Sequence, residues 1–214
     1  MLYEDGSITG TNITASDGIN LKSLDALARK GAIPLCALRL LRQLRTNNKL
    51  KHEERLQLYT YLADAGMTYD DTLQLIKQNF CAGGKMTDDK FSKEYQYNIQ
   101  HIYGLVGAKR RTHSSGCTSI IDNVPCTGFT YGCPFRSMNI RDIEDLVGQY
   151  IKCDVREAMN EVKPPMEHQA YHQACDHFFH SLFGVGAGSS NPAKYTQAAL
   201  SIIKGSDQDM QQTQ

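Results

Sequence analysis

The stretch LCALRLLRQLR (residues 35–45) indicates the fold class of this chain. Its leucines recur at every third position from Leu35 to Leu44, with Leu40 beside them. That spacing gathers the leucines on one face of an α-helix and leaves the arginines to the other faces. We therefore expect an amphipathic helix whose apolar face packs into a helical core.

The helical period continues outward from this stretch over most of the chain. Leu56, Tyr59 and Leu62 predict a second helix, which Gly66 ends. Thr68 and Thr87 are of a residue type that caps helix N-termini. Further helices are expected from Thr68 to Phe80, from Thr87 toward Tyr103, and over 140–151, 155–162, 166–183 and 192–203. Because strand-like alternation is scarce, the sequence predicts a mainly α fold.

The expected helices leave three regions without a helical period. Residues 107–132 are rich in Gly, Ser, Pro and Cys, so we expect an irregular, loop-rich middle with short elements. The polar segments 1–18 and 205–214 bury too little apolar surface to order themselves. The predicted organisation is therefore a flexible leader (1–18), one folded domain (19–204) with halves at 19–105 and 106–204, and a disordered tail (205–214).

The composition is that of an ordinary globular protein with 41% apolar residues, 21% charged residues and 23 charges of each sign. No apolar run reaches the roughly 20 residues of a membrane span, and residues 1–20 lack a signal-like hydrophobic stretch. We therefore expect an intracellular protein without membrane association. Its seven cysteines are then free thiols or metal ligands rather than disulfides.

The spacing of the cysteines is weak evidence for metal, because no C-x-x-C pair occurs. On spacing alone, scattered buried thiols are the favoured interpretation. Three local contexts favour ligands: Cys133 lies in YGCPFR (131–136), Cys117 follows a Gly/Ser-rich stretch, and Cys36 follows Pro34 at a helix start.

Basic residues gather between Arg29 and Arg55, where eight stand against two acidic ones. Arg42, Arg45 and Lys49 are spaced to share the face opposite the leucines. A solvated helix face and an anion-binding surface explain this pattern equally well.

An ordered set of short motifs resembles the C-terminal domain of the eukaryotic and archaeal DNA primase large subunit. The order is kept from about residue 20 to 203. The motifs are YQYNIQH (95–101), GCPFR (132–136), GGKMT (83–87) with KF (90–91), YG (103–104), KR (109–110), AY (170–171), AC (174–175), and NP (191–192) with Tyr195.

The resemblance implies a 4Fe–4S cluster that bridges two helical subdomains. By position its ligands fall on Cys36, Cys117, Cys133 and Cys175. Four thiolates also suit zinc, so that metal stays open. Cys81, Cys126 and Cys153 are left as ordinary thiols.

The resemblance also implies a surface for template DNA and the 5′-triphosphate end of an RNA primer. Lys51, His52 and Arg55 align with basic residues that hold the triphosphate. Tyr95 and Tyr97 are expected to offer sequence-blind stacking to bases, with at least one of them exposed. The remaining members of this surface are Arg42, Arg45, Lys49, Lys85, Met86, Asn98, His101, Lys109 and Arg110.

The implied function is a non-catalytic, regulatory one in the initiation of RNA primers for DNA replication. The phosphodiester-forming centre would lie in the small catalytic subunit. That subunit and DNA polymerase alpha would bind through regions outside this chain. The expected location is the nucleus, or the cytoplasm if the protein is archaeal. Three positions depart from the family pattern: Ala63 replaces a lysine, Ile76 a tryptophan and Tyr131 a histidine.

Two other function classes stay open at this point. The chain could be a redox-switched DNA-binding or electron-transfer iron–sulfur protein. Comparing the DNA affinity of the oxidised and reduced protein would distinguish this class from the primase class. It could also be a photolyase-like flavoprotein, although the absence of Trp disfavours a tryptophan electron chain. A zinc site on His168 and His172 is disfavoured, because no Glu follows His168 as a metalloprotease motif requires.

Overall fold

The computed structural model describes residues 18–212, so all but Gly18 of the predicted leader lies outside the described residues. Within 18–212 every regular element is a helix, which confirms the mainly α prediction. The elements are α1 (Leu24–Arg29), α2 (Leu35–Asn47), α3 (His52–Asp64), α4 (Tyr69–Ala82), α5 (Asp88–Phe91), the π-helix η1 (Ser92–Gln96), α6 (Tyr97–Ile102), α7 (Cys117–Asp122), α8 (Pro134–Ser137), α9 (Ile140–Tyr150), α10 (Val155–Glu167), α11 (Tyr171–Phe183) and α12 (Pro192–Gln212).

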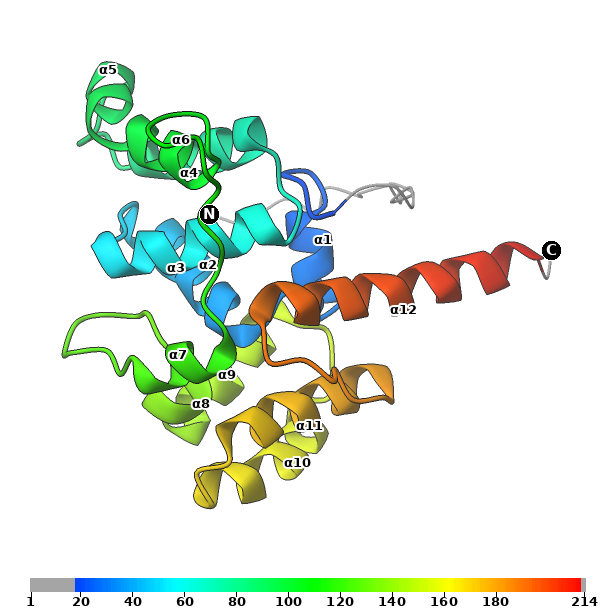
Figure 1. The fold of residues 1–214 in the computed structure, drawn as a ribbon. Helices are drawn as coiled ribbons and strands as arrows, with labels where there is room; N and C mark the ends of the chain where they lie inside the picture. The colour runs from blue at the N-terminus through cyan, green and yellow to red at the C-terminus, as the bar shows by residue number, and fades with distance from the viewer. Residues whose placement is uncertain (1–17, 213–214) are drawn as a thin grey trace, which may run out of the picture.

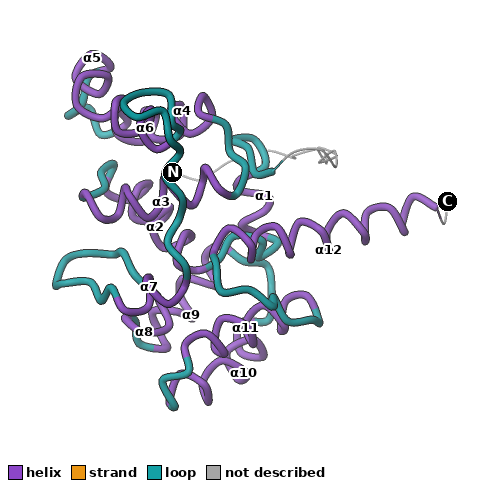
Figure 2. The backbone as a smooth tube through the Cα atoms, viewed as in Figure 1, coloured by secondary structure: helices purple, strands orange, loops and turns teal. Residues whose placement is uncertain are grey.

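Helices α2 and α3 form the centre of the molecule. Figure 1 shows α4, α5 and α6 on one side of this pair and α7 to α11 on the other. Helix α12 packs against α3 near its start and then extends away from the body. Loops join the short helices between α6 and α9, as the tube in Figure 2 shows. No helix within 18–212 has both the length and the apolar character that crossing a membrane requires.

One apolar cluster holds both halves of the domain together. The five leucines of the opening stretch, Leu35, Leu38, Leu40, Leu41 and Leu44, are all at most 1% exposed. Each such side chain contributes roughly 1.5–3 kcal/mol when fully buried. The cluster runs from Ile19 to Leu200, so α2 packs the two halves against a shared core.

Helix boundaries follow the predicted capping residues in the N-terminal half. The Thr68 side chain accepts a hydrogen bond from Asp71 N, and Thr87 accepts one from Lys90 N. After α3, Gly66 adopts φ +95°, a left-handed conformation that glycine reaches without steric cost. A Cβ at Gly66 would lie 3.0 Å from Cα of Gly18, so this turn also needs a residue without a side chain.

The C-terminal boundaries differ from the prediction. Helix α10 continues to Glu167 through Pro164 and Pro165, although each proline removes an N–H donor and usually ends or kinks a helix. The break falls at Gln169, whose φ is +57°, so the period over 166–183 belongs to two helices. His168 and His172 therefore lie on different elements. Helix α12 runs to Gln212 where we expected a disordered tail, since only Gly205 in that stretch is a poor helix former.

Candidate functional site

Four cysteines from distant segments line a single pocket. Cys36 lies in the first turn of α2, Cys117 begins α7, Cys133 caps α8, and Cys175 lies in α11. They share the wall of the pocket with apolar side chains, among them Phe135. We call this the cysteine pocket. The other cysteines, Cys81, Cys126 and Cys153, are not among the residues that line it.

The turn before Cys133 requires glycine. Gly132 has φ +83°, and a Cβ there would lie 2.6 Å from the carbonyl oxygen of Asn123. Pro134 then fixes the first position of α8, where its missing N–H costs nothing. The Gly-Cys-Pro order therefore sets the direction of the Cys133 side chain before any ligand binds.

The thiols of the cysteine pocket hold their protons more tightly than free cysteine does. Burial raises the pKa of Cys117 to about 11, and the neighbouring Cys133 adds to this shift. Burial also raises the pKa of Cys36 and of Cys175, and charge on the other pocket cysteines raises both further. A metal that binds here must therefore displace protons.

The pocket does not have the dimensions of a closed single-ion site. Within residues 18–212 no three His, Cys, Asp or Glu side chains stand close enough to hold one metal ion. The open space is about 30 Å³, near the volume of one water molecule, so a larger group requires the side chains to move apart. The donor set, four thiols in a mostly apolar wall that also includes His172 and Ser189, suits both an iron–sulfur cluster and zinc.

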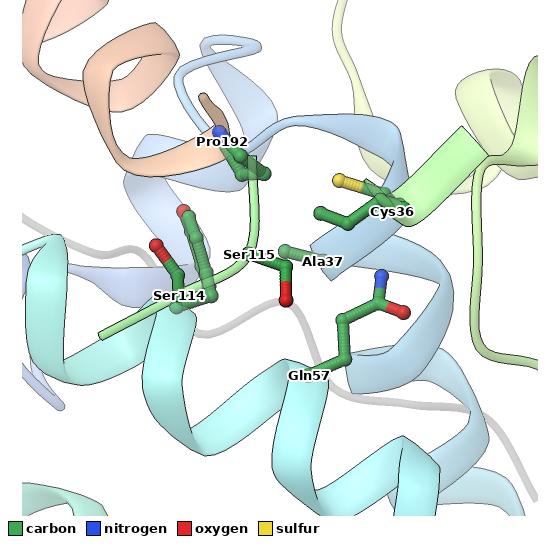
Figure 3. A pocket seen from close by; sticks show the side chains of 8 residues that line it. Cys36, Ala37, Gln57, Ser114, Ser115 and Pro192 are labelled. Carbon is green, nitrogen blue, oxygen red and sulfur yellow. The ribbon is translucent and has the colours of Figure 1, made fainter. Parts of the chain in front are cut away.

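Cys36 also borders a second, very small cavity. Figure 3 shows Cys36 of α2 and Gln57 of α3 around it, together with Ser114 and Ser115 of the segment before α7. Pro192, the first residue of α12, completes this wall. The cysteine pocket is thus adjacent to α3 and α12 as well as to the helices that supply its thiols.

A larger cleft of about 530 Å³ lies between the end of α2 and the region from α4 to η1. Four residues of the predicted nucleic-acid surface line it, namely Lys49, Lys85, Met86 and Tyr95. We call it the basic cleft. Its other lining residues, which the sequence analysis did not single out as contacts, are Asn47, Asn48, Phe80, Gly83, Lys90 and Glu94.

Arg55 connects the start of α3 with the basic cleft. Its guanidinium carbon lies 5.2 Å from the ring centroid of Tyr95, and its Nη1 donates to the carbonyl of Leu50 at 2.8 Å. The Tyr95 ring packs edge-on against Phe80, with centroids 4.9 Å apart. The π-helix η1 sets this position for Tyr95 and leaves Tyr97 59% exposed, which confirms that at least one tyrosine is exposed.

A short extended segment, Gly128 to Gly132, lies along α3. We call it the strap. The Lys51 ammonium donates to Gly128 O at 2.7 Å and lies 3.7 Å from the Phe129 ring centroid. Glu54 accepts from Thr130 N at 2.9 Å, and Gln57 accepts from Gly132 N at 2.7 Å. Every third residue of the helix thus meets every second residue of the strap.

The strap joins the two candidate regions. At one end it holds Lys51, which was predicted to bind the triphosphate, and at the other it leads directly into Cys133. Glu54 is 0% exposed, yet all its polar contacts are satisfied locally, since it also accepts from Lys51 N at 2.7 Å. Neither Glu54 nor Gln57 carried a sequence signal that would have marked it for this role.

The remaining predicted contacts are spread over a wider surface. Arg42 and Arg45 lie on α2 and are half-buried, and Arg45 pairs with Asp25 at 2.5 Å. Lys49 follows the end of α2, so it does not continue the helical face that was predicted. The other predicted contacts are exposed or half-buried and lie on α3, on α6 and in the following loop: His52, Asn98, His101, Lys109 and Arg110. The His101 ring centroid lies 6.4 Å from that of Tyr97.

The three positions that depart from the family pattern are buried. Ala63, Ile76 and Tyr131 are 1%, 0% and 8% exposed, respectively. The Arg111 guanidinium donates to the Ala63 carbonyl and lies 3.4 Å from Asp64. A cation therefore stands beside position 63 although the residue itself is alanine.

These features define an all-helical domain in which a four-thiol pocket and a basic, aromatic cleft are adjacent to the same central helix. Residues 26–196 match the family described as the C-terminal domain of the large subunit of eukaryotic and archaeal DNA primase, and the chain belongs to that family.

Curated relatives agree with this assignment. The chain is 34% identical over 185 residues to the probable DNA primase large subunit of Neurospora crassa, covering 83% of this chain and 36% of that protein. It is 29% identical over 188 residues to the probable DNA primase large subunit of Arabidopsis thaliana, covering 87% and 40%. Identity to the DNA primase large subunit of Homo sapiens is 31% over 191 residues, covering 87% and 37%. The chain thus spans well under half the length of these relatives.

Proposed function

We propose that this chain binds template DNA and the 5′-triphosphate end of an RNA primer, and so supports the start of primer synthesis in DNA replication. In this proposal it acts as a regulatory, non-catalytic domain, and the small subunit of a primase forms the phosphodiester bond. DNA polymerase alpha and the small subunit would contact regions outside this chain. In a eukaryote the site of action would be the nucleus.

The observation that carries the proposal is that basic and aromatic side chains from separate segments converge on the basic cleft. Lys49, Lys85 and Tyr95 come from three separate segments and line the same cavity, and Arg55 reaches the Tyr95 ring from α3. A triphosphate presents several acceptor oxygens, and each hydrogen bond to a charged group contributes about 1.5–3 kcal/mol. Several cations are therefore needed to prefer that end over an ordinary backbone phosphate, and the cleft provides them.

The aromatic residues beside the cleft fit contact with bases. Tyr97 is exposed, and its ring lies near that of His101 on the same helix. Base stacking on such a ring contributes about 1–3 kcal/mol and does not read sequence. A domain that starts primers at many template positions needs this kind of contact.

We propose further that Cys36, Cys117, Cys133 and Cys175 hold a 4Fe–4S cluster. When bound, the cluster supplies four metal–thiolate bonds that connect α2, α7, α8 and α11. The protein supplies four thiols in an apolar wall and the fixed Gly132–Pro134 turn. A function in electron transfer or redox switching would use the same pocket.

The binding proposal is tested with a 5′-triphosphate RNA primer annealed to a DNA template and the same duplex with a 5′-hydroxyl. Fluorescence anisotropy with the anaerobically purified chain should show at least about tenfold tighter binding of the triphosphate form. The preference should fall with salt, because cations of the cleft neutralise phosphates. Equal affinities for both duplexes would overturn the proposal.

The metal proposal is tested by iron, sulfide and zinc analysis of the same preparation, with an anaerobic visible spectrum. We expect about four irons and four sulfides per chain and broad visible absorption. One zinc per chain and no sulfide would indicate a zinc site in place of the proposed cluster. Absence of any metal would contradict the proposed ligand set.

A further inference from the structure

Two buried polar atoms lack a hydrogen-bond partner among the described residues, and they lie one helical turn apart. They are Nε of Arg55 and the hydroxyl of Tyr59, both on α3. Tyr59 is 0% exposed. A buried donor without a partner is costly, so native proteins contain few of them.

Among the described residues, the buried Tyr61 and Tyr195 and the half-buried Tyr103 show the usual arrangement. The Tyr61 hydroxyl, two residues along the same helix, pairs with Thr196 Oγ1 at 2.8 Å. Tyr195 donates its hydroxyl proton to Gly31 O at 3.2 Å. Tyr103 donates to Met67 O at 2.9 Å. The unpaired hydroxyl of Tyr59 is therefore a local exception.

The unpaired atoms lie next to Tyr95, a wall residue of the basic cleft, although neither Arg55 nor Tyr59 lines the cleft itself. Arg55 lies over the ring of Tyr95, and Tyr95 lines the cleft together with Lys49. Positive charge on Arg55 and the phenol of Tyr95 both act on the Tyr59 hydroxyl, whose pKa burial raises well above its usual value. Both unpaired atoms carry hydrogens at neutral pH, so both require an acceptor.

We infer that the Tyr59 hydroxyl and Arg55 Nε donate to a phosphate oxygen of the ligand in the basic cleft, which makes Tyr59 a specificity-determining residue. This inference rests on the proposed function. A phosphate oxyanion is an acceptor only, so it satisfies two donors without leaving a hydrogen of its own unpaired. Tyr59 is 0% exposed and Arg55 is half-buried, so the inference requires the Arg55 side chain to turn toward the ligand on binding and open the hydroxyl to the phosphate.

The inference makes an unusual prediction for Tyr59→Phe. Removing a hydroxyl that has no partner in the free protein should leave the Tm unchanged or slightly raised. The same change should weaken binding of the 5′-triphosphate duplex about tenfold and leave binding of the 5′-hydroxyl duplex nearly unchanged. Affinity and stability would then move in different directions.

Tyr61→Phe is the matched control, because it removes a buried hydroxyl that has a partner. Its Tm should fall by about 2–4 °C, which corresponds to loss of one hydrogen bond, with no change in either affinity. Both variants and the parent are measured as the full 214-residue chain, with metal content determined for each.

The outcomes separate this inference from the proposed function. If the parent chain prefers the triphosphate and Tyr59→Phe retains that preference, the role of Tyr59 is wrong and the proposed function stands. If Tyr59→Phe lowers the Tm as Tyr61→Phe does, the hydroxyl has a partner in the free protein, such as a water, and the inference fails. If the parent shows no preference, the proposed function itself fails.

Discussion

The cysteine pocket and the basic cleft flank the same central helices but differ in the burial and charge of the residues that line them. The pocket consists of neutral, largely buried thiols in an apolar wall, drawn from segments between Cys36 and Cys175. The cleft is open, carries exposed cations such as Lys49 and Lys85, and uses segments between residues 47 and 95. One region is therefore suited to hold the chain together and the other to exchange a ligand.

This difference determines which property each region controls. Replacing one thiol of a buried group destabilises the protein, because the neighbouring side chains pack against that thiol. Exposed cations are solvated in the free protein, so removing one costs little stability and mainly affects an anionic ligand. The strap is the exception, because it contacts Lys51 at one end and continues into Cys133 at the other.

The largest effect is expected for Cys133→Ser. A serine hydroxyl is a much poorer cluster ligand than a thiolate, so we expect the variant to be colourless and free of iron. If the proposed metal–thiolate bonds contribute to folding, the variant should lose more than about 4 kcal/mol in unfolding free energy. Cys126→Ser, at an exposed cysteine outside the pocket, should keep its spectrum and its Tm. A normally folded, coloured Cys133→Ser protein would contradict the view that the cysteine pocket controls stability and the basic cleft controls affinity.

Arg55→Ala should show the reverse pattern, with the larger effect on affinity and a smaller loss of stability from its contacts with Leu50 O and the Tyr95 ring. We expect about 10- to 100-fold weaker binding of the 5′-triphosphate duplex, which corresponds to one charge-assisted hydrogen bond. The 5′-hydroxyl duplex should lose much less. Arg141→Ala, at an exposed position of α9 on the other side of the central helices, should change neither affinity more than about twofold. Equal losses on both duplexes would mean that Arg55 contacts only backbone phosphates.

The sequence predicted the helices from α2 to α6 well because local signals act there, but it did not predict α1. Thr68 and Thr87 cap their helices as expected, and the leucines of α2 are all buried. The C-terminal boundaries depended on a left-handed residue at Gln169, which has no clear local signature, and on the continuation of α10 through two prolines, which normally predict a helix end. The predicted tail failed over 205–212 because polar residues without a breaker can continue a helix.

The candidate site was predictable only in part. Family resemblance supplied the four cysteines and the basic residues, and the fold gathers the cysteines in one pocket. Spacing could not do this, since eighty residues separate Cys36 from Cys117. Sequence reasoning missed the strap contacts of Glu54 and Gln57 and the unpaired hydroxyl of Tyr59, because these depend on which residue another segment places opposite.

Gln57→Ala tests whether the strap connects the two regions. The variant loses the bond from Gly132 N and leaves that buried N–H without a partner, which costs about 1–3 kcal/mol of unfolding free energy. If the strap transmits this change, iron should be lost faster in air, and triphosphate affinity should fall about threefold. Gln74→Ala, at an exposed position of α4, is the control. Lower stability with unchanged iron retention and affinity would show that the regions are independent.

The smallest effect is expected at Asp64, which fixes the segment that leads from α6 to Cys117. Burial raises the pKa of this carboxyl, but hydrogen bonds from Ser114 N and Ser114 Oγ and from His113 outweigh it, so the pKa lies below the ordinary value of an aspartic acid. Its stabilising effect is therefore present above that ordinary value and lost as the pH falls through the lowered value.

Asp64→Asn should lower the unfolding free energy by about 1 kcal/mol at pH 7 because it weakens these bonds. Denaturant unfolding of both proteins between pH 7 and pH 3 should show the difference shrinking at the acidic end. Because Ser114 lies only three residues before Cys117, the variant should also lose iron slightly faster than the parent. A difference in stability that stays constant down to pH 3 would mean that the shape of the side chain, and not its charge, holds the segment in place.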